Sequence, residues 1–232
     1  MVATETRTAV RETLDTMDEA RRYNAWLYDR ARPLLGRRVL DAGAGTGAFI
    51  ERLLADGRTV VALEPDPALA ATLRERYAAD PRLTVVETDA AGVEGEGFDT
   101  IICFNVLEHV ADDDAVLRAF RGALKPDGAL LLLVPAHPTL YGRTDRALGH
   151  ERRYRRADLE GRLVDAGFRV DVLRAVNPIG ALGWLVSSRL LRRDRIPSAS
   201  LRVYDRAVPV FRALDSLTLP FGLSLWAVGR AA

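Results

Sequence analysis

The sequence is poor in the residues that most often build disulfides and metal clusters. Its 232 residues include one cysteine and three histidines, so no disulfide can form within the chain and no cysteine-rich zinc site is expected. The cysteine, Cys103, lies inside an apolar run, which predicts a small core residue rather than a nucleophile. We therefore expect no bound metal.

An excess of charge of either sign is also missing. The chain carries 33 Lys and Arg against 32 Asp and Glu, a net charge of +1. Because nucleic-acid binders are strongly basic, this balance argues against a nucleic-acid partner. Arginine nevertheless gathers in residues 143–162 and 189–195. These stretches are either solvated faces or the lining of a pocket for an anionic substrate.

Long apolar runs are absent too. No run is long enough to cross a bilayer, and the first twenty residues are charged and lack the apolar centre of a secretory signal. These features predict a cytoplasmic protein without a transmembrane span. With 48% hydrophobic residues, the chain can fill a core, and we expect residues 1–232 to form a single domain.

What the sequence does contain is a glycine-rich turn. Residues 39–49 read VLDAGAGTGAF: a short apolar strand stops at Asp41, and a helix is predicted to start near Thr46. Glycine permits a sharp turn and lets a ligand lie against bare main chain, while the N–H groups of a helix start would point toward that ligand. The stretch therefore predicts a nucleotide-type binding loop built on Gly43, Gly45 and Gly47.

Asp41 discriminates between the ligands that such a loop accepts. Gly43, Gly45 and Ala48 fit the dinucleotide fingerprint G-x-G-x-x-G/A. A carboxylate two residues before the first glycine would repel a pyrophosphate, but it would attract the ammonium and sulfonium groups of S-adenosylmethionine (SAM). SAM is therefore the favoured ligand. The alternatives are NAD(P) or FAD, and a turn that holds no ligand.

The second predicted strand, residues 59–63, ends at another acid, Glu64. A carboxylate at this place in a doubly wound sheet can accept hydrogen bonds from both ribose hydroxyls. Asp66 follows two residues later and is predicted to cap a helix over residues 67–77. We assign the ligand role to Glu64 and the capping role to Asp66.

Three further apolar runs predict strands at residues 83–86, 98–104 and 129–135, and the first two run directly into polar segments that contain Asp89 and Asn105. Alternation of such strands with helical segments is typical of a parallel α/β sheet. The polar side chains are therefore expected at the edge where the strands end.

Taken in order, these segments resemble the class I SAM-dependent methyltransferases. The loop with its acid resembles their motif I, and residues 98–109, FDTIICFNVLEH, resemble the "FD…N-x-LEH" segment of ubiquinone/menaquinone-type and related small-molecule methyltransferases. The resemblance covers roughly residues 36 to 135. It implies an α/β fold with a doubly wound, seven-stranded, mostly parallel sheet, an N-terminal helical cap, and a helical insertion before the last strand.

The resemblance also implies a cofactor site. Asp89 would hydrogen-bond the adenine amino group with the backbone N–H of Ala90 beside it, although an exposed loop aspartate is the alternative for Asp89. Asn105 and Val106 would lie along the cofactor. The full set of cofactor-binding candidates is Tyr23, Asp41, Ala42, Gly43, Ala44, Gly45, Gly47, Glu64, Pro65, Asp89, Ala90, Asn105 and Val106.

Two parts of the chain fall outside the cofactor-binding core, which we place at residues 36–175. Residues 1–35 form the expected N-terminal cap, in which an amphipathic helix over residues 20–28 carries Tyr23 and Trp26 on one face. In the related family such helices cover the SAM site. Tyr23 and Asn24 would then reach the methionine end of the cofactor, or the aromatic side chains simply dock the helix.

The second part is an insertion, residues 176–220, ahead of a final strand in residues 221–232. Its two apolar stretches, near residues 179–186 and 204–214, are predicted helices separated by arginines. A substrate lid, a dimer face and a helix resting on a membrane are the three readings. The protein is accordingly expected to be a monomer or a homodimer.

The loop after the fifth strand holds the candidate acceptor-side residues. His150, His137 and Tyr141 are the candidate catalytic residues, because a histidine can act as a base near neutral pH and a tyrosine can orient a substrate. His109, which can also brace its helix, joins a candidate substrate-binding set completed by Arg152, Arg153 and Tyr154. The alternative is a loop pinned by hydrogen bonds and arginine stacking.

The sequence therefore predicts a SAM-dependent methyltransferase. It would pass a methyl group by in-line displacement to a small or lipid-like acceptor, anionic in one reading, and release S-adenosylhomocysteine (SAH). A non-catalytic SAM- or nucleotide-binding subunit and an NAD(P)-dependent reductase are the alternatives.

Overall fold

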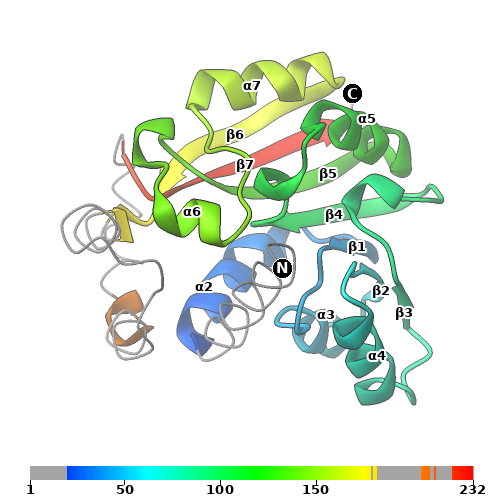
Figure 1. The fold of residues 1–232 in the computed structure, drawn as a ribbon. Coiled ribbons are helices and arrows are strands. Elements are labelled where there is room, and N and C mark those ends of the chain that lie inside the picture. Colours follow the sequence, from blue (N-terminus) through cyan, green and yellow to red (C-terminus); the bar gives the residue numbers. More distant parts are fainter. Residues whose placement is uncertain (1–19, 179, 182–204, 210–211, 213–220, 232) are drawn as a thin grey trace.

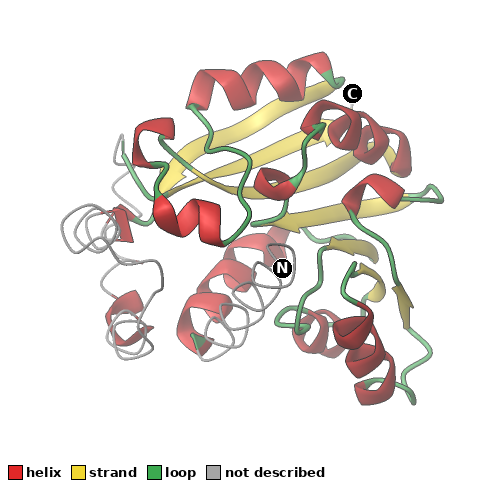
Figure 2. Cartoon of the chain, viewed as in Figure 1, coloured by secondary structure: helices red, strands yellow, loops and turns green. Residues whose placement is uncertain are grey.

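A computed structural model describes residues 20–178, 180–181, 205–209, 212 and 221–231. Its centre is a seven-stranded sheet with helices on both faces (Figures 1 and 2). The strands are β1 (Arg38–Ala42), β2 (Thr59–Leu63), β3 (Leu83–Val86), β4 (Phe98–Phe104), β5 (Leu124–Pro135), β6 (Phe168–Val176) and β7 (Ser224–Ala231).

The described helices follow the strands in sequence. They are α2 (Arg21–Ala31), α3 (Ile50–Ala55), α4 (Pro67–Arg76), α5 (Asp113–Ala123), α6 (Arg143–Ala147) and α7 (Arg156–Asp165). Four single 3-10 turns connect them to the sheet: η1 (Arg32–Leu34), η2 (Ala90–Gly92), η3 (Leu107–His109) and η4 (Pro138–Leu140).

The strand order is β3-β2-β1-β4-β5-β7-β6. The ladders from β3 through to β5 are parallel, whereas β7 pairs antiparallel with both β5 and β6. This confirms the predicted doubly wound, seven-stranded and mostly parallel sheet. The order reverses between β1 and β4, and ligands in such sheets bind at the carboxyl ends of the strands at that switch point.

The central strands are buried on both faces because their side chains alternate between two cores. In β5, Leu130, Leu132 and Val134 pack in the core that contains α5 and α7. Leu131 and Leu133 pack on the opposite side, in the core that contains α2 and α3. Figure 1 shows these two groups of helices on opposite sides of the sheet. A continuous aliphatic run is thus a signature of a central parallel strand.

Two predicted boundaries were wrong. The helix expected from Thr46 begins at Ile50, because positive φ angles at Gly45 and Gly47 keep the chain in turns until then. The strand expected from residue 129 begins at Leu124, with a register shift opposite residues 98–100. Asp127 takes a positive φ of 59° there, which marks an irregularity near the start of β5.

The predicted helix over residues 20–28 is present as α2, and its aromatic face is buried. Most of the predicted insertion, including the helices near residues 179–186 and 204–214, lies outside the described residues, apart from helical residues 180–181 and 205–209. No helix in the described part of the chain combines the length and the apolar character that crossing a membrane requires.

Candidate functional site

The glycine loop lies where the strand order reverses. Gly43 follows β1 with a φ of +78°, and its amide N and that of Ala44 both donate to the Leu63 carbonyl at the end of β2. A Cβ placed on Gly43 would lie 2.4 Å from a methyl carbon of Val106, just beyond β4. Only glycine therefore permits this close approach between the ends of β1 and β4.

Glu64 joins the glycine loop to the end of β2. Its carboxylate accepts hydrogen bonds from the Gly45 amide at 2.7 Å and the Asp66 amide at 2.8 Å, and the residue is 5% exposed. Each carboxylate oxygen keeps a further lone pair, so hydroxyl groups of a ligand can still bind. Burial raises the pKa of Glu64, while the two amides oppose the shift.

Asp41 is a buried acid with an unused oxygen. The residue is 3% exposed at the end of β1, and its Oδ2 has no hydrogen-bond partner among the described residues. Burial, followed by repulsion from Glu64, raises the pKa of Asp41 to about 7. A buried carboxyl group with a free oxygen is costly unless a ligand pairs with it, so Asp41 is suited to a cationic partner.

The other predicted cofactor residues fall around this loop. Asp66 caps α4 by accepting from the Ala68 and Leu69 amides, as predicted. Asp89 is exposed and caps η2 through the Ala91 and Gly92 amides, so its adenine role stays a prediction. Among the remaining members of the set, Ala42, Ala44 and Ala90 are buried, whereas Pro65 and Asn105 are exposed.

Three non-glycine residues with positive φ follow the strands on this side of the sheet. Asn105 comes after β4 with a φ of 54°, His137 after β5 with 60°, and Asn177 after β6 with 62°. Such backbone conformations cost energy in residues with a Cβ, and they concentrate at functional sites. The strained positions thus mark the same edge of the sheet as the glycine loop.

Tyr23 lies on the buried face of α2. It is 6% exposed, its ring centroid is 5.6 Å from that of Trp26, and burial raises its pKa to about 12. Its backbone amide, like that of Arg22, donates to the Asp205 carboxylate. These contacts account for docking of the helix, and contact of Tyr23 with a cofactor stays a prediction.

Two buried acids hold the loop that follows η4. Asp145, fully buried, accepts from His150 Nδ1 at 2.9 Å and Arg153 Nε at 2.8 Å. Burial alone would raise its pKa, but these partners lower it overall. The Tyr141 hydroxyl donates to the His150 carbonyl at 2.7 Å.

Asp113, at the start of α5, is the second of these acids. It accepts from the Tyr154 hydroxyl at 2.8 Å and pairs with Arg152 at 2.6 Å and Arg162 at 2.9 Å. Arg153 and Tyr154 are buried. Hydrogen bonds therefore hold this loop, as in the alternative prediction, but ion pairs rather than arginine stacking accompany them at Asp113. The substrate-binding role of Arg152, Arg153 and Tyr154 stays a prediction.

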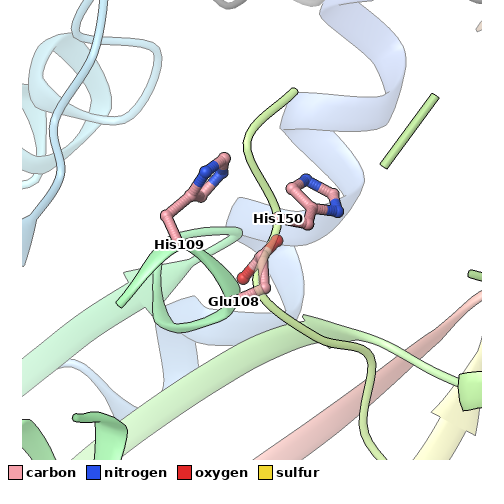
Figure 3. Close-up of side chains that lie close together, drawn as sticks. All are labelled: Glu108, His109 and His150. Atoms are coloured by element: carbon pink, nitrogen blue, oxygen red, sulfur yellow. The ribbon is translucent and has the colours of Figure 1, made fainter. Parts of the chain in front are cut away.

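His109 and His150 meet although they are far apart in the sequence. Their ring centroids are 4.7 Å apart and nearly perpendicular, and Figure 3 shows the Glu108 carboxylate between them. His109 keeps an exposed surface, yet desolvation of its ring, followed by repulsion from His150, lowers its pKa. Burial raises the pKa of Glu108 to about 8. His137, half-buried, lies two residues beyond the end of β5 and follows Ala136, which pairs with Tyr154.

Sequence reasoning missed Glu108, Asp113 and Asp145 as organising residues. Glu108 was visible within the LEH segment and Asp113 within an acidic helix start. Nothing in the pattern indicated that the residues after η4 would fold back against both. The predicted core cysteine was correct, because Cys103 is buried and has no disulfide partner.

A family model described as a methyltransferase domain matches residues 40–130. A ubiquinone biosynthesis O-methyltransferase of Xanthomonas euvesicatoria pv. vesicatoria (strain 85-10) is 38% identical over 104 residues, which is 43% of this chain and 43% of that protein. The chain thus spans less than half the length of the curated relatives that it matches.

Solved structures share the fold over most of the chain. Phosphoethanolamine N-methyltransferase 2 of Haemonchus contortus, in complex with S-adenosyl-L-methionine, aligns with a TM-score of 0.64 and 20% identity over 90% of this chain and 52% of that one. The cyclase SpnF aligns with a TM-score of 0.61 and 18% identity over 90% of this chain and 80% of its own. At these identities the likeness shows the fold alone.

Proposed function

We propose that the protein binds SAM and transfers its methyl group to a small or lipid-like acceptor, an inference supported by the match of residues 40–130 to a family described as a methyltransferase domain. The product of the cofactor would be SAH. The observation that carries the proposal is Asp41, a buried carboxyl group with an unpaired oxygen directly behind a glycine loop. A cationic ligand without phosphate satisfies that oxygen, whereas a pyrophosphate would be repelled.

The residues that would hold SAM surround the ends of β1, β2 and β4. Asp41 would face its positive charge, Glu64 would accept from the ribose hydroxyls through its remaining lone pairs, and Val106 would lie beside it. Gly43 leaves room for main-chain contact because a side chain there would meet Val106. We further propose Tyr23, Asp89 and Asn105 as contacts along the rim.

SAM supplies a methyl group that is already activated, so the protein has to align the acceptor and exclude water. A hydroxyl acceptor also needs a proton acceptor. His150 is oriented for this role, because Asp145 binds its Nδ1 and leaves Nε2 with the lone pair. His137, at the end of β5, is the second candidate, and Tyr141 would orient the acceptor.

The names of the relatives indicate which acceptors to test first. The curated relatives are O-methyltransferases of ubiquinone biosynthesis, and a structural neighbour is a phosphoethanolamine N-methyltransferase. We propose a hydroxyl oxygen on a quinone-type amphiphile as the first acceptor class, with amines as the second. SAH release in the presence of each class would discriminate between them.

Isothermal titration with SAM and SAH tests the proposed cofactor. Wild type is expected to bind both, and Asp41→Asn is expected to weaken SAM binding by about tenfold or more, as for loss of a charge-assisted contact. Glu87→Gln is the matched control, because Glu87 is exposed after β3, where it forms a surface ion pair with Arg74.

Three results would overturn the cofactor assignment. They are no binding of SAM by wild type, equal affinities of wild type and Asp41→Asn, and binding of NADH in place of SAM. SAM binding without SAH release from any hydroxyl or amine acceptor would instead support the alternative of a non-catalytic binding subunit.

A further inference from the structure

The fold assembles three potential metal ligands at the end of β4. One ligand atom from each of Glu108, His109 and His150 lies within 4.8 Å of those of the other two. Glu108 and His109 belong to η3, whereas His150 comes from the loop after α6 (Figure 3). The sequence predicted no metal site, because it contains three histidines and no cysteine cluster.

Glu108 supplies an observation independent of the clustering. The residue is 1% exposed, and its Oε2 has no hydrogen-bond partner among the residues that the structure describes. The backbone N–H of Glu108 donates a hydrogen bond to the carboxyl group of the same residue. A buried carboxyl oxygen without a partner is costly, and a cation between the two imidazoles would satisfy it.

Both histidines are oriented through hydrogen bonds of the kind that position metal ligands. His150 Nδ1 lies 2.9 Å from the buried Asp145 carboxylate, and His109 donates to the backbone of Gly149. In metal sites, the second ring nitrogen of a ligating histidine binds a carboxylate or a carbonyl, which fixes the tautomer. Each imidazole therefore has a second nitrogen available for a ligand.

We propose that Glu108, His109 and His150 bind one divalent transition-metal ion. Two imidazoles and one carboxylate form a His₂Glu donor set suited to Zn²⁺, with a fourth position open. Ligand atoms around a tetrahedral zinc ion are about 3.3 Å apart, so ligand atoms that lie within 4.8 Å of one another would have to approach by up to about 1.5 Å on binding. His109 is exposed, which gives its side chain freedom for that movement.

The location of the site indicates a role for the ion in methyl transfer, an inference that rests on the proposed function. Val106, which approaches Gly43 closely, immediately precedes η3, so the ion would be held next to the region assigned to methyl transfer. An oxygen of the acceptor can bind there and become more acidic. A cation and a proton compete for Nε2 of His150, so His137 is the candidate base in the metal-loaded protein.

Zinc titration of the chelator-treated full chain, in competition with a chromophoric chelator, tests the site directly. Wild type is expected to bind one Zn²⁺ per chain, and Glu108→Gln, His109→Gln and His150→Gln are each expected to weaken binding by at least about tenfold. Co²⁺ is expected to give the visible absorption of a four- or five-coordinate site in wild type and to lose it in the variants.

His137→Asn is the matched control, since it removes the remaining histidine and suits the positive φ at that position. It is expected to bind zinc as wild type does. The exposed His109→Gln keeps the test informative if substitution of buried Glu108 prevents folding. Less than half an equivalent of zinc in wild type, or unchanged affinity in His109→Gln, would overturn the proposal. SAM titration on the same samples reports separately on the cofactor site.

Discussion

At the scale of single residues, the buried carboxyl group of Asp41 lowers the stability of the ligand-free protein and at the same time favours binding of a cationic ligand. The folded chain buries its carboxyl group without a partner for Oδ2 among the described residues. The resulting pKa of about 7, against the usual 3.8, means that the fold favours the protonated form. A cationic ligand would favour the ionised form, so the feature that destabilises the free protein is the one that would recruit the ligand.

Substitution of Asp41 by Asn is therefore expected to stabilise the ligand-free protein in a pH-dependent manner. Between about pH 4 and pH 7 the folded state holds a proton that the unfolded state has lost, so the free energy of unfolding of wild type falls as the pH rises. At about pH 8 Asp41→Asn should be more stable by up to a few kcal/mol, measured by urea unfolding.

Below about pH 3 the two proteins should converge, because Asp41 is then protonated in both the folded and the unfolded state. Glu87→Gln, at an exposed acid, is expected to follow the wild-type pH dependence. Saturating SAM should reverse the order at about pH 8, since ligand binding stabilises only the protein that binds it well. A parallel pH dependence of Asp41→Asn and wild type would contradict the assignment.

At the scale of elements, the strands were the easiest part to predict. The limits of β2, β3 and β4 agree with the predicted ones, because each is a short aliphatic or aromatic run between turn residues. The start of α3 was missed because the positive φ values of Gly45 and Gly47 are set by the glycine loop itself. The Glu108–His150 contact could not be foreseen, since it depends on how the loop after η4 packs.

Because buried acids hold this loop, we expect Asp-to-Asn substitutions at a buried and at an exposed position to lower the free energy of unfolding by different amounts. Asp145→Asn removes the charge that faces buried Arg153 and His150 and is expected to lower the free energy of unfolding by about 3–5 kcal/mol. Asp114→Asn, at a residue 46% exposed and paired with Arg162, should change it by less than about 1 kcal/mol. Urea midpoints would provide the comparison, and equal losses would show that the loop is not held by Asp145.

At the scale of the whole molecule, one sheet separates two cores. Adjacent residues of β5 point into different ones, as Leu131 and Leu132 do. Because the same backbone supports both cores, neither can be lost without disturbing the strand ladders of the other. That residues 1–232 form a single domain stays a prediction. Whether the two cores unfold together can be tested by substitution of one residue in each.

Leu131→Ala and Leu132→Ala are each expected to lower the free energy of unfolding by about 2–5 kcal/mol. Tryptophan fluorescence, to which the buried Trp26 and Trp226 on the Leu131 side contribute, and circular dichroism should give coincident transitions for both variants. Val172→Ala, at a residue 38% exposed on β6, should change the stability little. Separate transitions for the two probes would mean that the cores unfold independently.

The position of β7 has a consequence for how the chain is made. β7 lies between β5 and β6 in the sheet, yet the ribosome synthesises it after both (Figure 1). Until residue 231 has emerged, the apolar β5 has one unpaired edge, which is the kind of edge that promotes association between chains. Native topology is therefore reached by insertion of a late strand into the middle of the sheet, so the nascent protein needs protection from its neighbours between the synthesis of β5 and that of β7.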